Sequence, residues 1–142
     1  MRSLLPLLLC CLLLATDVQA EDDDHNDDLE DQFRNLITQQ LSALRSGDAE
    51  AAWAWAHPNI KGRFLTAERF YTMVVRQYQP LTEFSVIRFR ELEAAGDNWV
   101  LPVWLRTDDD QQYLAFYALS QTNQGEWRIA GCQLVEYQPP GI

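Results

Sequence analysis

The chain of 142 residues contains little of what most catalytic and metal sites are built from. It has two histidines, His25 and His57, and neither is joined by Cys or Glu at the spacing of metal ligands, so we expect no metal. It has no GxSxG motif, no phosphate-binding glycine run and no dinucleotide-binding fingerprint. Serine-dependent acyl transfer is therefore not expected, and no cofactor is predicted.

Cysteine is also scarce. The chain has three cysteines, and two of them, Cys10 and Cys11, lie in an N-terminal apolar run. If that run is removed, Cys132 is the only thiol and no internal disulfide can form, so packing must stabilise the domain. We expect Cys132 to be a small buried apolar residue, and the alternative is a reactive nucleophile.

The first twenty residues have the order of a secretory signal peptide. Arg2 supplies a positive start, Leu4 to Leu14 form an apolar run, and Val18 and Ala20 are the small residues before a cleavage site. The run is shorter than the roughly 20 residues that a membrane-spanning helix needs, so we predict no stable membrane anchor. We predict a signal peptide over residues 1–20, cleavage near Ala20, and a periplasmic or secreted protein.

The net charge of −10 is concentrated in one short stretch. Residues 21–31 hold eight acids and no base, whereas residues 32–142 hold 12 acids and 10 bases. Such a run repels itself and stays solvated, so we predict an acidic disordered tail over residues 21–31, with weak cation binding as the alternative. The chain has no basic stripe, and nucleic acid is not an expected partner.

Residues 32–138 are expected to form one α+β domain in which three helices precede a sheet. An apolar stripe with helical spacing predicts a first helix over residues 29–46, ended by Gly47 in a left-handed conformation. Asp48 is the expected cap of a second helix that stops near His57, because Pro58 follows. Thr66 is the expected cap of a third helix, closed by Pro80.

Four segments after residue 82 are rich in β-branched and aromatic residues: 83–93, 98–106, 111–120 and 126–136. Short connections predict an antiparallel four-stranded meander, with the helices on one face of a curved sheet. Pro102 cannot donate to a strand ladder, which predicts an edge or a bulge.

Both faces of the predicted strands are apolar. Leu114 and Phe116 alternate with Tyr113, Ala115 and Tyr117, so neither side of this strand is polar. A sheet with helices on one face should have a polar second face. We therefore expect that something covers the second face, and a homodimer through this face is the leading interpretation; a curled sheet or the chain termini are the alternatives.

Three stretches are familiar: LSALRSGDAEAAWAWAHPNIKGRF, FYTMVVRQYQPL and LAFYALSQTNQGEWRIAGCQL. They resemble a bacterial family known as domain of unknown function 4864, and the likeness covers most of residues 33–136. Its members resemble the nuclear-transport-factor-two-like, or cystatin-like, α+β roll, in which a helical layer packs into a curved sheet. The resemblance implies this fold and at most a pocket between helices and sheet, because related rolls serve many functions.

We interpret the chain as an exported, non-catalytic binding or interaction module. The alternatives are a cone-type enzyme of the isomerase or dehydratase kind acting on a small apolar substrate, and a purely structural domain with a solid core. A ligand or substrate needs a cavity of roughly 300 Å³ or more. Six residues are candidates to line it: Trp53, Arg63, Tyr71, Tyr78, Arg88 and Tyr117.

Each of these six residues offers a group that can contact a small apolar ligand. Trp53 offers a flat apolar surface, and the three tyrosines offer hydroxyls. Arg63, expected in the loop between the second and third helices, and Arg88, on a strand, can bind a carboxylate through two hydrogen bonds. The competing interpretation is that the aromatic residues fill the core and that the arginines pair with Glu91 or Glu93.

Overall fold

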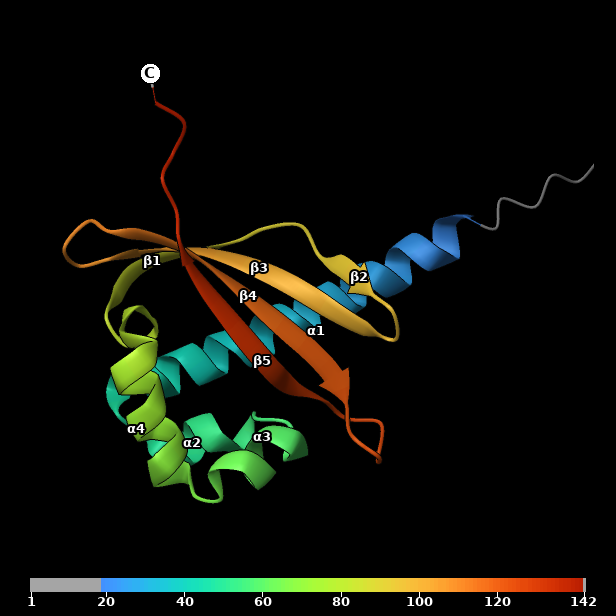
Figure 1. Cartoon of the computed structure of the whole chain (residues 1–142). Coiled ribbons are helices and arrows are strands. Elements are labelled where there is room, and N and C mark those ends of the chain that lie inside the picture. The colour runs from blue at the N-terminus through green and yellow to red at the C-terminus, as the bar shows by residue number, and fades with distance from the viewer. Residues whose placement is uncertain (1–18, 142) are drawn as a thin grey trace, which may run out of the picture.

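The fold is α+β, with helices packed against a five-stranded antiparallel sheet (Figure 1). The computed structural model describes residues 19–141, and their side chains from residue 23. The helices are α1 (Gln19–Ser46), α2 (Ala49–Ala54), α3 (Pro58–Phe64), α4 (Ala67–Gln77) and the 3₁₀ helix η1 (Gln79–Leu81). The strands are β1 (Phe84–Phe89), β2 (Glu93–Ala95), β3 (Asn98–Thr107), β4 (Gln112–Gln121) and β5 (Trp127–Glu136). The predicted signal peptide lies almost wholly outside the described residues.

Helix α1 carries the predicted apolar stripe on its buried face. Its buried apolar residues are Phe33, Leu36, Ile37, Leu41, Ala43 and Leu44. The helix ends as predicted, because Gly47 has a φ of 77°. The backbone N–H groups of Gly47 and Asp48 donate to the carbonyls of Leu44 and Ala43 at 3.3 and 2.9 Å, which is the hydrogen-bond pattern of a Schellman motif.

The acidic stretch differs from the expectation of a disordered tail, because in the structure it is the N-terminal part of α1. Adding residues to a helix that is already formed costs little, since each new residue gains one hydrogen bond. The first helix therefore begins well before residue 29.

Helices α2 and α4 begin at the predicted caps. The Asp48 carboxylate accepts from the Ala51 N–H at 3.1 Å, and the Thr66 hydroxyl accepts from the Arg69 N–H at 3.2 Å. The segment between them, which we expected to be a loop, is helix α3. It starts at Pro58 because proline needs no N–H donor at a first helical position, and His57 is its cap.

The sheet has five strands rather than the predicted four, in the order β1-β3-β4-β5 with β2 also on β3. Strands β1 and β2 pair with different halves of β3: β1 pairs with residues 103–107 and β2 with residues 98–100. They form one interrupted edge strand, where a single segment over 83–93 was expected. The predicted antiparallel order of the remaining strands is confirmed.

Pro102 lies in the interior strand β3, and the register of β3 with β4 has no bulge there, so the prediction of an edge or a bulge was wrong. On one side it is the register partner of Phe116 in β4. On the other side its carbonyl accepts from the Arg90 N–H at 2.8 Å, in the gap between β1 and β2. A residue in a strand directs its N–H and C=O to the same side, so the donor that proline lacks falls at the interruption of the neighbouring strand.

The core lies between α1 and one face of the sheet. Its sheet residues with exposure of 0% are Leu101, Val103, Leu105, Ala115, Tyr117 and Leu119. At one end of this layer, the rings of Phe33 on α1 and Trp127 on β5 meet edge to face with centroids 5.0 Å apart, a geometry that aromatic pairs favour. This contact ties α1 to the end of β5.

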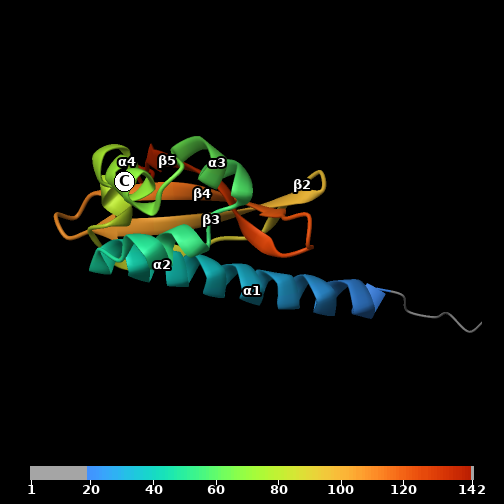
Figure 2. The ribbon, with the colours of Figure 1, turned by 90° about the horizontal axis from the view of Figure 1, so that it is seen from below.

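No helix within residues 19–141 covers the opposite face of the sheet. In Figure 1, α1 passes behind the sheet and the other helices lie beside the β5 edge; Figure 2 shows α1 and α2 on one side of the strands and α3 and α4 near β5. This outer face carries the partly buried apolar residues Val86, Val100, Trp104, Leu114, Phe116 and Val135. None of the described helices is both long and apolar enough to cross a membrane.

Candidate functional site

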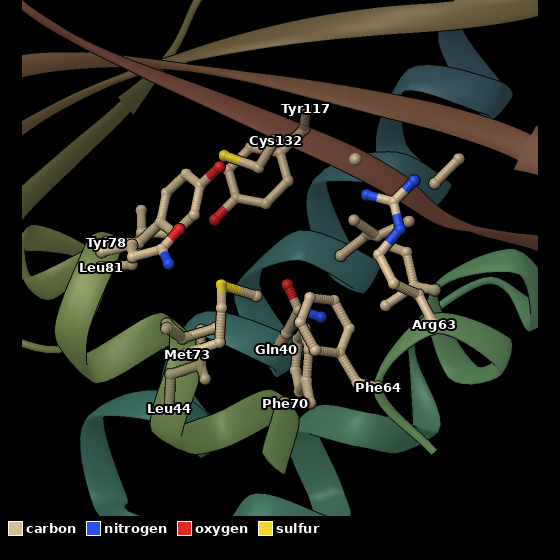
Figure 3. Close-up of a pocket in the computed structure, with 16 residues that line it drawn as sticks. Gln40, Leu44, Arg63, Phe64, Phe70, Met73, Tyr78, Leu81, Tyr117 and Cys132 are labelled. Carbon is tan, nitrogen blue, oxygen red and sulfur yellow. The ribbon is translucent and has the colours of Figure 1, made fainter. Parts of the chain in front are cut away.

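A pocket of about 340 Å³ opens between the helices and the inner face of the sheet near β5 (Figure 3). We call it the main pocket. It is lined by Gln40, Leu44, Ile60, Arg63, Phe64, Phe70, Met73, Val74, Gln77, Tyr78, Leu81, Tyr117, Ile129, Ala130, Gly131 and Cys132. The walls come from α1, α3, α4, η1, β4 and β5, and most of the side chains are apolar, as is usual for sites that bind small molecules.

The main pocket exists because α3 is tied to the edge of the sheet while α4 packs on α2 and α3. The Ile129 carbonyl accepts from the His57 N–H at 2.8 Å, and the Ile129 N–H donates to the Trp55 carbonyl at 2.9 Å. The register of β5 then shifts by one residue between Ile129 and Gly131. Bulges of this kind bend a strand locally, and this one lies in the pocket wall.

Tyr117 places a hydroxyl without a partner in the main pocket. The residue has an exposure of 0%, its hydroxyl neighbours the Cys132 thiol, and no oxygen or nitrogen atom of the described residues accepts a hydrogen bond from it. Figure 3 shows the hydroxyl directed into the pocket. Burial raises the pKa of Tyr117 well above its ordinary value of 10.0, so the group stays a neutral donor. A buried hydroxyl whose neighbour is a thiol, a weak acceptor, is poorly paired and lowers the stability of a protein, and an oxygen acceptor on a ligand would pair with it.

Cys132 is the register partner of Tyr117 on β5 and also lines the main pocket. It is half-buried rather than fully buried as expected. Burial raises the pKa of its thiol from 9.0 to about 12, and the neighbouring Tyr117 hydroxyl only partly opposes this change. The thiol is therefore protonated at neutral pH, which disfavours its interpretation as a nucleophile.

Gln40 is a polar residue of the helical wall that sequence reasoning missed. It has an exposure of 3%. Its amide nitrogen donates to the Ala52 carbonyl at 3.2 Å, and its amide oxygen accepts nothing from the described residues. Gln40 lies in the apolar stripe of α1, and a buried polar residue within such a stripe is the signal that could have identified it.

Three of the six candidate residues, Arg63, Tyr78 and Tyr117, line the main pocket. The pocket thus brings together groups from α3, β4 and the end of α4. The position of Arg63 corrects one expectation, because it lies in the last turn of a helix and not in a loop.

The other three candidates, Trp53, Tyr71 and Arg88, do not line the main pocket. Trp53 packs on Phe70 with ring centroids 5.6 Å apart. The Tyr71 hydroxyl lies beside Gly47, 3.6 Å from where a Cβ would be. Arg88 is on the outer face, with its guanidinium 5.8 Å from the centre of the Trp104 ring. It forms no ion pair with Glu91 or Glu93.

A second, more open pocket of about 490 Å³ adjoins the main one. The two share Gln77, Tyr78 and Cys132. The second pocket adds Glu136, a carboxylate that does not line the main pocket. No histidine and no carboxylate lines the main pocket itself. Among the described residues, no group of three or more His, Cys, Asp or Glu is arranged to hold a metal ion.

His57 has a structural position at the end of a helix. Its Nδ1 accepts from the Asn59 N–H at 3.1 Å, and its Nε2 lies 3.1 Å from the Gln121 carbonyl. Both contacts are satisfied by the neutral ring with its proton on Nε2. The ring therefore caps α3 and ties it to the end of β4, and it lines neither pocket.

Comparison with known proteins gives one result. The family model described as "Domain of unknown function (DUF4864)" matches residues 26–142. This range includes every residue that lines the main pocket. No curated protein and no solved structure matches the chain.

Replacing Tyr117 with Phe should stabilise the ligand-free protein. The substitution removes a buried hydroxyl that has no partner, so the free energy of unfolding should rise by about 1 kcal/mol. Urea denaturation followed by tryptophan fluorescence measures this change. Tyr113→Phe, on the same strand but only half-buried, is the control and should change stability by less than about 0.5 kcal/mol. A loss of stability in Tyr117→Phe would contradict the absence of a partner.

Native Cys132 should react slowly with iodoacetamide. Only the thiolate reacts, and raising the pKa from 9.0 to about 12 lowers the thiolate fraction at about pH 8 on the order of 10³-fold relative to the unfolded chain. The same shift predicts that the thiol's contribution to stability is complete below pH 9.0 and is lost as the pH rises towards 12.

Mass spectrometry of native and guanidinium-unfolded protein measures the labelling rates. Val75→Cys provides an exposed thiol on α4 as a positive control, since Val75 has an exposure of 39%. Rapid labelling of Cys132 in the native protein would show that the thiol is accessible and ionised.

Proposed function

The chain belongs to the DUF4864 family, and we propose that it is a non-catalytic module that binds a small, largely apolar ligand in the main pocket. The observation that carries this proposal is the Tyr117 hydroxyl, which is buried with no oxygen or nitrogen acceptor in a wall of mostly apolar side chains. Buried polar groups in proteins are nearly always paired. A bound molecule with a hydrogen-bond acceptor supplies the missing partner.

The size of the main pocket supports a binding module over a purely structural domain. In a solid structural core, the aromatic side chains would fill the space between helices and sheet. Phe64, Phe70 and Tyr78 instead line a space of about 340 Å³, which is within the range of small-molecule sites.

The same lining favours binding over catalysis. A cone-type enzyme needs a general base within hydrogen-bond reach of its substrate. The residues of the main pocket include no carboxylate or histidine, and the Cys132 thiol is kept protonated by its raised pKa. A binding role requires neither group.

Two further expectations belong to this proposal. The succession of helices and antiparallel strands, with a pocket between them, is in keeping with a nuclear-transport-factor-two-like roll. The order of charged, apolar and small residues over positions 1–20 supports export to the periplasm or the medium. We propose a binding protein of this fold that meets its ligand outside the cytoplasm.

Binding of N-phenyl-1-naphthylamine, a neutral apolar dye, tests the proposed function. The dye should bind with a saturable rise in fluorescence. Met73→Trp should weaken binding at least about tenfold, about 1.4 kcal/mol, because Figure 3 shows Met73 directed into the pocket and an indole would occupy its space. Val75 lies two residues after Met73, on the exposed side of α4. Val75→Trp therefore places the same side chain outside the pocket, and this variant should bind the dye as the wild type does. Absence of saturable binding would refute the proposal.

We also propose a homodimer through the outer face of the sheet. This face carries Trp104, Leu114 and Phe116 without a covering helix (Figure 1). It also holds the Arg106 Nε, which is buried without a hydrogen-bond partner and lies 3.9 Å from the Asp110 carboxylate. Contiguous apolar surface of this kind is uncommon on soluble monomers, and a second copy would cover it.

Sedimentation of the protein measures its oligomeric state. The wild type should sediment as a dimer, and Phe116→Glu should shift it to a monomer because a carboxylate would be buried in the interface. Val75→Glu places the same charge on the exposed side of α4 and should leave the dimer intact. A wild-type monomer at high protein concentration would reject the dimer.

A further inference from the structure

Arg63 differs from most basic residues of the described chain in that its charge has no partner. Seven other basic residues have an ion pair or lie over an aromatic ring: Arg34, Arg45, Lys61, Arg88, Arg90, Arg106 and Arg128. Arg63, Arg69 and Arg76 have neither. Of these three, only Arg63 lines a pocket.

The position of Arg63 makes it the only fully charged group of the main pocket. No Asp, Glu, His or Lys lines this pocket, and the other polar side chains of the lining are Gln40, Gln77, Tyr78, Tyr117 and Cys132. Figure 3 shows the guanidinium at the side of the pocket towards α3, with the Tyr78 and Tyr117 hydroxyls on the opposite side. Between these polar sides lie Phe64, Phe70 and Met73.

We propose that the ligand is an amphipathic carboxylate with a second oxygen function, such as a hydroxy or oxo acid. Its carboxylate pairs with the Arg63 guanidinium, its apolar body lies against Phe70 and Met73, and its second oxygen accepts a hydrogen bond from Tyr117. A guanidinium matches a carboxylate through two parallel hydrogen bonds. This inference rests on the proposed function and adds the chemical class of the ligand.

The charge distribution of the protein leaves the choice of a carboxylate over a neutral ligand to Arg63. Residues 32–142 hold 12 acids and 10 bases, so the domain has no excess of positive charge to attract an anion. Carboxylate binding therefore depends on a local positive charge that is not already neutralised, and Arg63 is the residue of the main pocket that supplies it. A neutral apolar molecule as long as the carboxylate ligand gains no binding energy from Arg63, because it has no charge to pair with the guanidinium.

Displacement of bound N-phenyl-1-naphthylamine by octanoate and by 1-octanol tests the carboxylate. Octanoate should displace the dye from the wild type about fivefold more tightly than octanol, because Arg63 is exposed to solvent. Arg63→Met should abolish this preference while leaving octanol unchanged. Arg69→Met, which removes another unpaired arginine outside the pocket, should retain the preference. Circular dichroism confirms that each variant is folded.

Displacement by 8-hydroxyoctanoate tests the second oxygen. It should bind about fivefold more tightly than octanoate in the wild type, and this difference should vanish in Tyr117→Phe, which keeps the ring and lacks the donor. Tyr113→Phe, outside the main pocket, should retain the difference.

The outcomes separate the two proposals. Equal displacement by octanoate and octanol, failure of octanoate to displace the dye, or an unchanged preference in Arg63→Met would overturn the carboxylate assignment while dye binding still supports the proposed function. Equal affinity of octanoate and 8-hydroxyoctanoate would overturn the role of Tyr117. Absence of dye binding to the wild type would remove the proposed function itself.

Discussion

The backbone bridge between Ile129 and the segment from Trp55 to His57 determines how the helical half of this protein meets its sheet. Two hydrogen bonds of 2.8 and 2.9 Å join α2 and α3 to the edge strand β5. The His57 ring adds a contact to the Gln121 carbonyl at 3.1 Å. Because α3 is held at this edge and α4 packs on α2 and α3, space remains between α4 and β5. The main pocket is that space.

The polar groups of the main pocket add little to the stability of the empty protein and are suited to binding a ligand. An unpaired Tyr117 hydroxyl lowers stability, whereas a phenylalanine there would not. Arg63 is exposed to solvent, so its lack of an ion pair costs the empty protein little and leaves the guanidinium free to bind a ligand. Sites that bind ligands are commonly less stable than the surrounding core would allow. These two residues, on opposite sides of an apolar pocket, are therefore better explained by a ligand than by folding.

Local patterns predicted most elements because their signals are short-range. The stripe of α1, the Gly47 stop, the Asp48 and Thr66 caps, and the strands after Asn98 all follow from residues within a few positions of one another. Helix α3 was missed because Pro58 stops one helix and starts the next. The split of β1 from β2 depends on Pro102 in a neighbouring strand, and a single strand's sequence does not contain that information.

The sequence by itself determined the fold class, the family, the apolar character of both sheet faces, and three of the residues that line the main pocket. The tertiary structure alone decided that Arg63, Tyr78 and Tyr117 share a pocket with Gln40 and Cys132, while Trp53, Tyr71 and Arg88 do not. The physical reason is that periodicity assigns a residue to a face of its own helix or strand. Which faces enclose a space is decided by long-range contacts, here the bridge at Ile129 and the bulge that follows it.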